Sequence, residues 1–442
     1  MTRNQRITAL VLLASINAFG FIDRVMIALV AEKIKAEFQV SDLQIGLLGG
    51  TAFAVVNALA AVPIARMAER FYRSYVTAGF LLMASVFTTL AGATASFAQL
   101  FACRLGMAAG NAATEAPPHS MISDMYPKEK RASAISIFML GVPLAALFGS
   151  FLGGSIAESF GWRNTFVFFG VGGAIISLLC FLFLKEPQRG ASDGAASEAL
   201  STIGVVRILL GSSSLRWLVI ALSTISLGSF GVNTFLPAFF SRDYGLDAGQ
   251  AGFVFGLISG IGALIGTLFG GYVSEWMARR DPRWLLGVPA LGLILGAPLF
   301  VAGLLSGNLY VAVPVMLIGS AAFYTAMGPS IATLHGSFSA HSRATGSAVF
   351  LLIIHLLGQG LGPPLVGIVS DTVSAAMYTG GNFASECAGA AAQIEGSACA
   401  RASADGLRYA IGTFALFFVG AGGLLYLAAR AGWKTVARTA GA

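Results

Sequence analysis

The sequence predicts an all-α membrane protein with twelve transmembrane helices in two pseudo-symmetric six-helix bundles. Three observations support this fold class: the composition, the series of apolar segments, and a repeat between the halves of the chain. Only 11% of the 442 residues are charged and 56% are hydrophobic, whereas about 25% of a soluble domain is charged. A soluble protein of this composition would expose large apolar patches to water, and a bilayer removes that problem.

Apolar segments near the roughly 20 residues needed to cross a bilayer follow one another along the whole chain. The first six are 7–30, 43–65, 75–95, 98–121, 131–156 and 164–184, and the second six are 215–240, 249–274, 284–305, 309–333, 344–370 and 406–430. A polar segment rich in serine, alanine and glycine separates the two sets. We therefore expect an N-terminal bundle over 1–184, a cytoplasmic linker over 185–214 and a C-terminal bundle over 215–442.

The positions of lysine and arginine predict the orientation, because these residues gather on the cytoplasmic side of membrane proteins. With both termini in the cytoplasm, 19 of the 27 basic residues lie in cytoplasmic segments and 6 lie on the opposite side. Arg24 and Arg104 lie within helices. Topology thus explains the net charge of +7, which gives no reason to expect nucleic acid as a partner.

A short motif occurs once in each half. Ala65-Arg66-Met67-Ala68-Glu69-Arg70 and Arg73 follow the second segment, and Gly271-Tyr272-Val273-Ser274-Glu275 with Arg279, Arg280 and Arg283 follows the eighth. In both, a small residue precedes an acid by four positions and arginines follow. Such a repeat of six-helix units, with a substrate site between them, is a known transporter plan.

These two loops resemble the cytoplasmic signature of the major facilitator superfamily, Gly-x-Leu-Ala-Asp-Arg-x-Gly-Arg. This chain departs from the signature, since Ala65 replaces the first glycine, Glu69 the aspartate and Tyr72 the second glycine. The resemblance implies the major facilitator fold and a monomer that works by alternating access.

Other motifs resemble bacterial members of the spinster branch of that superfamily over essentially the whole chain. They are Phe21-Ile22-Asp23-Arg24, Thr114-Glu115-Ala116, Tyr126-Pro127-Lys128-Glu129-Lys130-Arg131, Gly161-Trp162-Arg163-Asn164, Arg343-Ala344-Thr345-Gly346 and Gly360-Leu361-Gly362-Pro363-Pro364. The resemblance implies export of lysophospholipids or sphingosine-type lipids, with proton coupling, in a bacterial inner membrane.

Two acids, Asp23 and Glu115, are the acidic residues within the twelve predicted spans. A charge near the bilayer centre costs roughly 2.5–3.5 kcal/mol on insertion scales, so a retained charge is a functional candidate. Arg104 and Glu115 are eleven residues apart, about 16 Å along one face of a continuous helix, with Asn111 between them.

We expect Asp23, Glu115 and Arg24 to form the proton-coupling site, in which the two acids compete for protons and for Arg24. Desolvation and a neighbouring arginine have opposite effects on a carboxyl pKa, so opening of the cavity would change protonation. The alternative is a static buried ion pair that fixes the first helix against the fourth. Substrate contacts are expected from Arg24, Arg104, Asn111, Glu115, Ser226, Asn233, His355 and Gln359, with an arginine holding an anionic headgroup.

Three functions remain open from the sequence. The first is a proton-coupled secondary transporter that exports an amphipathic lipid, and the second is a proton-coupled symporter of a small organic anion. The third is a transporter-like membrane sensor or receptor. Nucleotide-binding loops, metal-ligand spacings and nucleophile motifs do not occur in the sequence, so we expect no cofactor, no metal and no enzyme activity.

Two features outside the spans also carry expectations. The repeated loops predict a cytoplasmic latch that pairs across the halves in one conformation, formed by Glu69, Arg70, Arg73, Glu275, Arg279 and Arg280. In the loop between the last two spans, Cys387 and Cys399 are candidates for a disulfide in an oxidising periplasm.

Overall fold

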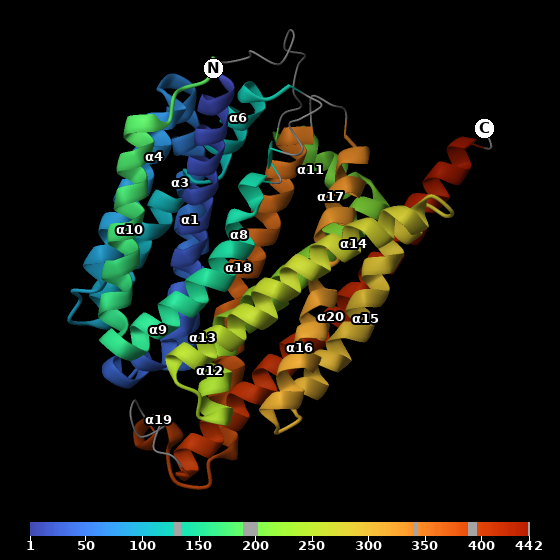
Figure 1. The fold of residues 1–442 in the computed structure, drawn as a ribbon. Helices are drawn as coiled ribbons and strands as arrows, with labels where there is room; N and C mark the ends of the chain where they lie inside the picture. Colours follow the sequence, from blue (N-terminus) through green and yellow to red (C-terminus); the bar gives the residue numbers. More distant parts are fainter. Residues whose placement is uncertain (128–133, 136, 189–201, 339–342, 388–395, 441–442) are drawn as a thin grey trace.

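The computed structural model describes residues 1–127, 134–135, 137–188, 202–338, 343–387 and 396–440. Helices make up its regular structure, and both termini lie at one end of the molecule (Figure 1). We call this the termini end and the opposite one the far end. Eleven helical segments of the described chain are long and apolar enough to cross a membrane. The predicted all-helical membrane fold is confirmed.

The first half consists of long helices joined by short turns. Its elements are α1 (Arg3–Phe38), α2 (Asp42–Gly46), η1 (Leu47–Thr51), α3 (Ala52–Arg70), α4 (Arg73–Ala91), α5 (Phe97–Asn111), α6 (Ala116–Met125), α8 (Gly141–Leu144), η2 (Ala145–Gly149), α9 (Ser150–Phe160) and α10 (Trp162–Phe183). The η segments are stretches of π-helix that continue into α-helix on both sides. Helix α11 (Thr202–Gly211) follows in the predicted linker.

The second half repeats this plan. Its elements are α12 (Ser213–Tyr244), α13 (Ala248–Phe255), η3 (Gly256–Ile261), α14 (Gly262–Ala278), α15 (Trp284–Leu304), α16 (Leu309–Tyr324), α17 (Met327–Gly336), α18 (Arg343–Met377), α19 (Phe383–Glu386) and α20 (Ala398–Ala440). Small residues allow close helix packing here. A methyl group at Gly266 would meet the Ala321 carbonyl group, so glycine lets α14 and α16 come together.

The fourth predicted span is not one continuous helix, and that expectation was wrong. Helix α5 ends at Asn111, and α6 begins at Ala116 with prolines in its first turn. Proline has no backbone N–H to donate and favours the first turn of a helix, so Pro117 and Pro118 fit a new start. Arg104 and Glu115 therefore do not lie on one straight helical face.

The outer surface of the described chain is apolar, as expected where a helix faces lipid. Phe168, Leu178 and Leu268 are among the large apolar side chains that are more than half exposed. Buried apolar residues from both halves form the main core. The composition of the chain is thus distributed as in a membrane protein, with apolar groups both inside and outside.

The two halves meet closely at the far end. Helix α9 of the first half packs along α13 of the second, and α2 packs against α18 (Figure 1). Nearer the middle, the Thr51 hydroxyl donates a hydrogen bond to the Gly360 carbonyl at 2.5 Å. Two of these contacts, α2 with α18 and Thr51 with Gly360, join parts of the chain that are about 300 residues apart in the sequence.

Candidate functional site

Asp23 lies on α1 and is only 7% exposed. Its carboxylate accepts hydrogen bonds from the Asn111 amide nitrogen at 2.8 Å and from the Thr88 hydroxyl at 3.1 Å. Both donors are neutral and belong to other helices, α5 and α4. The predicted proton site is therefore a buried carboxylate held by neutral donors at the centre of the first half.

The neighbouring residue, Arg24, points to a different partner. Its Nη2 atom lies 3.2 Å from the Glu115 carboxylate, and its guanidinium lies 5.0 Å from the centre of the Phe53 ring. The Glu115 side chain is 48% exposed and that of Arg24 is 14% exposed. Glu115 also interacts electrostatically with His119 and with His355 of the second half. This ion pair bridges α1 and the break between α5 and α6, and it has an accessible side.

Arg104 is fully buried and bonds to backbone oxygens. It donates to the carbonyls of Asp23 at 2.7 Å, Leu48 at 3.2 Å and Gly49 at 3.4 Å. Leu48 and Gly49 belong to η1, so Arg104 joins α1, α5 and the π-helical turn. Buried and bound to three carbonyls, Arg104 positions the backbone around Asp23, and its contact with substrate stays a prediction.

The second half supplies polar groups that gather at two places. His355 packs edge-on against Phe230, with ring centres 5.9 Å apart, and Gln359 on the same helix is buried. Gly358 lies one turn along α18 from His355. Ser226 of α12 is buried against this glycine, where a Cβ would meet its side chain. Of these, only His355 is connected to the charged groups of the first half by an interaction that the structure describes.

Asn233 belongs to a separate cluster within the second half. It accepts a hydrogen bond from the Ser259 hydroxyl at 2.6 Å and donates to the Ser229 carbonyl at 2.8 Å and to the Tyr324 hydroxyl at 3.4 Å. The cluster borders a cavity of about 10 Å³, room for a single water molecule. The structure does not bring Asn233 together with Asp23 and Arg24.

In this conformation the ion pairs described for Arg73 and Arg279, two residues of the predicted cytoplasmic latch, do not join the two bundles. Arg73 binds Asp124 at 2.6 Å and Glu186 at 2.7 Å. Arg279 lies 3.4 Å from Glu275, one turn away on the same helix. Pairing across the halves stays a prediction, for a conformation in which these loops meet.

Cys387 and Cys399 are joined by a disulfide in the loop between α18 and α20. Residues 388–395 between them lie outside the described chain. Before the first cysteine, Glu386 accepts a hydrogen bond from the Tyr378 hydroxyl at 2.8 Å. That bond, together with backbone donors of Asn382 and Gly381, lowers the pKa of the Glu386 carboxyl below its ordinary value.

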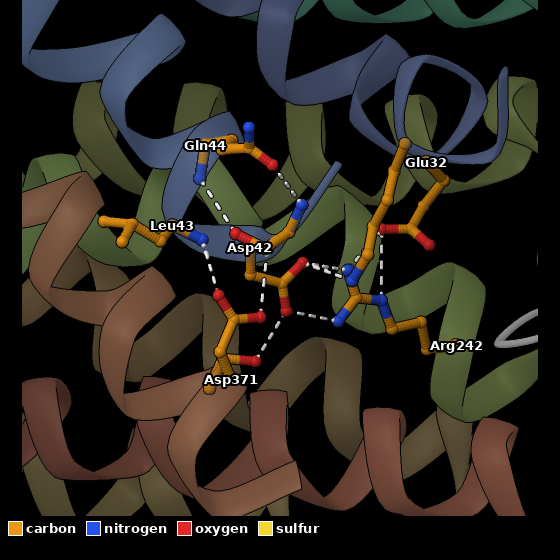
Figure 2. A network of polar contacts seen from close by, with 9 residues as sticks. Glu32, Asp42, Leu43, Gln44, Arg242 and Asp371 are labelled. Carbon is orange, nitrogen blue, oxygen red and sulfur yellow. Dashed lines mark hydrogen bonds and ion pairs between the residues drawn. The ribbon is translucent and has the colours of Figure 1, made fainter. Parts of the chain in front are cut away.

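A polar network at the far end was missed by the sequence analysis (Figure 2). Arg242 at the end of α12 binds Glu32 of α1 at 2.6 Å and Asp42 of α2 at 2.6 Å. Lys35 lies 2.7 Å from the same Asp42 carboxylate. Asp42 is 1% exposed, and its charge is therefore matched by two cations, one from each half.

Asp371 and Ser370 on α18 complete the network. The Asp371 carboxylate accepts from the backbone N–H groups of Asp42 at 3.1 Å and Leu43 at 2.9 Å, and the Ser370 hydroxyl donates to Asp42 at 2.7 Å (Figure 2). Free N–H groups and the helix dipole favour an anion at the start of α2. We call Glu32, Lys35, Asp42, Arg242, Ser370 and Asp371 the far-end latch. In the sequence they are only scattered charges at span ends, and Ser41-Asp42-Leu43-Gln44, a capping signal, was the available clue.

The family model for the Major Facilitator Superfamily matches residues 12–363. The chain belongs to the major facilitator superfamily. Its family and fold are those of transporters and not of enzymes.

Several members of the superfamily match most of this chain. An MFS-type efflux pump of Mycolicibacterium smegmatis is 30% identical over 362 residues, which cover 82% of this chain and 84% of the pump. Protein spinster homolog 3 of Danio rerio is 27% identical over 83% of this chain and 77% of its own length. A sphingosine-1-phosphate transporter of Xenopus tropicalis is 24% identical over 81% of this chain and 72% of its own.

Solved structures of this superfamily agree with the fold. The crystal structure of a bacterial homolog of the human lysosomal transporter spinster, inward-facing and unoccupied, has a TM-score of 0.88 and 30% sequence identity. The match covers 98% of this chain and 99% of that one. The inward-facing, occupied form has a TM-score of 0.85. The predicted resemblance to bacterial spinster proteins is confirmed.

Proposed function

We propose that the chain is a proton-coupled secondary transporter that exports an amphipathic lipid, a lysophospholipid or a sphingosine-type lipid, by alternating access. The observation that carries this proposal is the presence of two acids with different surroundings, Asp23 on α1 and Glu115 at the start of α6. Asp23 is buried among neutral donors, whereas Glu115 is half-exposed and paired with Arg24. Related proteins named as spinster and as sphingosine-1-phosphate transporters support the lipid substrate.

Arg24 supplies the headgroup contact in this proposal. Its Nε atom is buried and has no hydrogen-bond partner among the described residues, while Nη2 is 3.2 Å from Glu115. A guanidinium binds phosphate through two parallel N–H groups. Arg24 therefore keeps donor capacity for an anionic headgroup, and such a headgroup competes with Glu115 for the same cation.

Proton binding follows from the same geometry. When a phosphate takes Arg24, the Glu115 carboxylate loses its cation and its affinity for a proton rises. Asp23 is buried, with neutral hydrogen-bond donors on its carboxylate and the cations Arg24 and Arg104 nearby, so its charge depends on the balance between burial and these groups. A change in which end of the cavity is open alters this burial, and it thereby links protonation to the conformational cycle.

The test of the substrate is lysophospholipid transport in proteoliposomes that contain the purified protein, with and without an imposed proton gradient. The proposal predicts gradient-stimulated transport, and it predicts that Arg24→Gln weakens substrate binding about tenfold or more, since hydrogen bonds to a charged group are lost. Arg401→Gln is the matched control, because Arg401 is exposed and donates to the Gly396 carbonyl beside the start of α20, outside the site. Equal binding by the Arg24→Gln variant and the native protein would contradict the assignment.

A second candidate is a proton-coupled symporter of a small organic anion. It is favoured by a match to a hexuronate transporter of Bacillus subtilis, 23% identical over 64% of this chain and 68% of that protein. The same proteoliposomes separate the candidates, because hexuronate uptake without lysophospholipid transport would select the second. An arginine that binds a phosphate also binds a carboxylate, so Arg24 serves either substrate.

A further inference from the structure

The Asn111 side chain is buried with half of its amide unused. The residue is 1% exposed; its amide nitrogen donates to Asp23, but its Oδ1 atom has no hydrogen-bond partner in the described chain. A buried acceptor without a partner costs free energy, and such groups need an explanation. An amide presents a donor and an acceptor on one planar group, and rotation by half a turn exchanges their places.

The two protonation states of Asp23 need different partners. An ionised carboxylate only accepts hydrogen bonds, whereas a protonated carboxyl group also donates one through its O–H. The amide nitrogen that serves the ionised form would then face this O–H group, and two donors would meet. Rotation of the amide by half a turn places Oδ1 toward Asp23, where it accepts from the new O–H.

The nitrogen of the rotated amide needs an acceptor, and Thr114 is able to supply one. Thr114, in the break between α5 and α6, donates its hydroxyl to the Asn111 carbonyl at 2.8 Å, which leaves its oxygen free to accept. Asn111 Oδ1 and Thr114 Oγ1 both lie 3.0 Å from the point that a Cβ at Gly20 would occupy. The two side chains form no hydrogen bond with each other in the described structure. Glycine at position 20 leaves room beside both polar atoms, and the rotated amide would donate to Thr114 by moving into this room.

We infer that Asn111 and Thr114 form an amide switch. The switch couples the protonation state of Asp23 to the break between α5 and α6. This inference rests on the proposed proton binding at Asp23. With Asp23 ionised, the amide nitrogen bonds to the carboxylate. With Asp23 protonated, Oδ1 accepts from Asp23 and the nitrogen donates to Thr114, the residue before Glu115. The proton state at Asp23 is in this way connected to the segment that holds the Arg24–Glu115 ion pair.

The surrounding charges do not change in this step. Arg24 on the same helix and Arg104 on α5 are the charged groups that act on Asp23, and Thr88 of α4 is its other hydrogen-bonding neighbour. Arg104 is bound to backbone carbonyls and Arg24 to Glu115. The Thr88 hydroxyl is also able to accept, because it has a second acceptor in the Ala84 carbonyl at 2.9 Å, but that exchange ends within α4. Rotation of the amide is the exchange that reaches the break between α5 and α6.

Two near-isosteric variants test the switch because they act on different states. Asn111→Leu removes the charge-assisted bond to ionised Asp23, so the pH at which half of Asp23 is protonated rises by about one unit or more. Thr114→Val removes the acceptor that only the rotated amide uses. The protonated state is then penalised, and the same midpoint falls by about half a unit. A merely structural role does not produce shifts of opposite sign.

The measurement is pH-difference infrared spectroscopy of the full-length protein in liposomes, in which the carboxyl band of Asp23 is the one that Asp23→Asn removes. Asn57→Leu is the matched control, since Asn57 donates to the Ala108 carbonyl and not to Asp23, and its midpoint stays at the native value. Thermal unfolding of each variant verifies that it is folded. Midpoints that shift in the same direction, or a Thr114→Val midpoint equal to the native one, would overturn the switch while proton binding at Asp23 stands. Absence of an Asp23 band from the native protein would instead overturn the proposed proton site, and the switch with it.

Discussion

At the scale of single residues, Arg104 shows that a charged side chain within a membrane span can hold backbone segments together through hydrogen bonds to their carbonyls. It is the largest fully buried side chain of the described residues, and all of its oxygen partners are carbonyls. The planar guanidinium reaches three carbonyls at once, and the ammonium group of lysine does not reproduce that fork. Arg104 thus fixes the position of Asp23 relative to the π-helical turn η1.

Replacement of Arg104 by lysine is expected to destabilise the protein without changing its charge. Loss of two of the three bonds predicts a fall of the unfolding temperature by about 5 °C or more, measured on the purified protein. Arg279→Lys is the control: Arg279 is 74% exposed and pairs with Glu275 on the surface, and its change is expected to stay within about 1 °C. Equal effects of the two substitutions would show that the carbonyl contacts of Arg104 do not stabilise the fold.

The charged residues of the site were predictable, but their neutral partners were not. Asp23 and Glu115 stand out because acids are scarce in the spans, and the structure places Arg24 beside one of them. Thr88, by contrast, is one of many hydroxyl residues in apolar segments, and nothing in its local sequence indicates the contact with Asp23. Such contacts depend on how helices rotate against one another, which hydropathy does not determine.

At the scale of elements, the break between α5 and α6 places Glu115 beside Arg24. The sequence analysis extended one helix over 98–121 because the segment is apolar throughout. Pro117 and Pro118 were the available signal, since two prolines are tolerated at a helix start and not inside a helix. The non-helical turn from Ala112 to Glu115 also contains Thr114, the last residue of the proposed amide switch.

The far-end latch is the element-scale feature that opposes opening at that end. Asp371→Asn is expected to open it, because asparagine offers one acceptor oxygen where the carboxylate offers two, and its negative charge at the start of α2 is lost. Two hydrogen bonds to a charged group are replaced at most by one neutral bond, so the ratio of open to closed molecules should rise about tenfold or more.

Spin labels at Phe160→Cys and Tyr310→Cys measure that ratio as a distance distribution, in a protein whose free cysteines Cys103 and Cys180 are replaced by alanine. Both label positions are highly exposed, Phe160 at the end of α9 in the first half and Tyr310 at the start of α16 in the second. These helix ends lie toward the far end (Figure 1). Glu158→Gln is the control: Glu158 accepts from the Ala248 N–H across the halves at 3.3 Å but is 44% exposed. An unchanged distribution in Asp371→Asn would show that the far-end latch does not hold the halves together.

At the scale of the whole molecule, two similar halves carry different chemistry. An offset of 206 residues relates Glu69 to Glu275, and the same offset relates Asp23 to Ser229. In the second half that place is neutral, since the Ser229 carbonyl accepts from Asn233 within a cluster of amide and hydroxyl groups. The acids of the site therefore belong to the first half, while the second contributes His355. The sequence was sufficient for the helical fold and for this asymmetry. It was insufficient for the far-end latch, which requires knowing which helix ends meet.

The most direct test of the account is proton movement driven by substrate. Proteoliposomes that contain the native protein and a pH-sensitive dye are given a lysophospholipid gradient with no imposed pH difference. Proton-coupled export predicts protons moving opposite to the lipid in native protein, and no proton movement in Asp23→Asn, which still binds lysophospholipid. Proton movement by Asp23→Asn equal to that of the native protein would contradict proton coupling through Asp23.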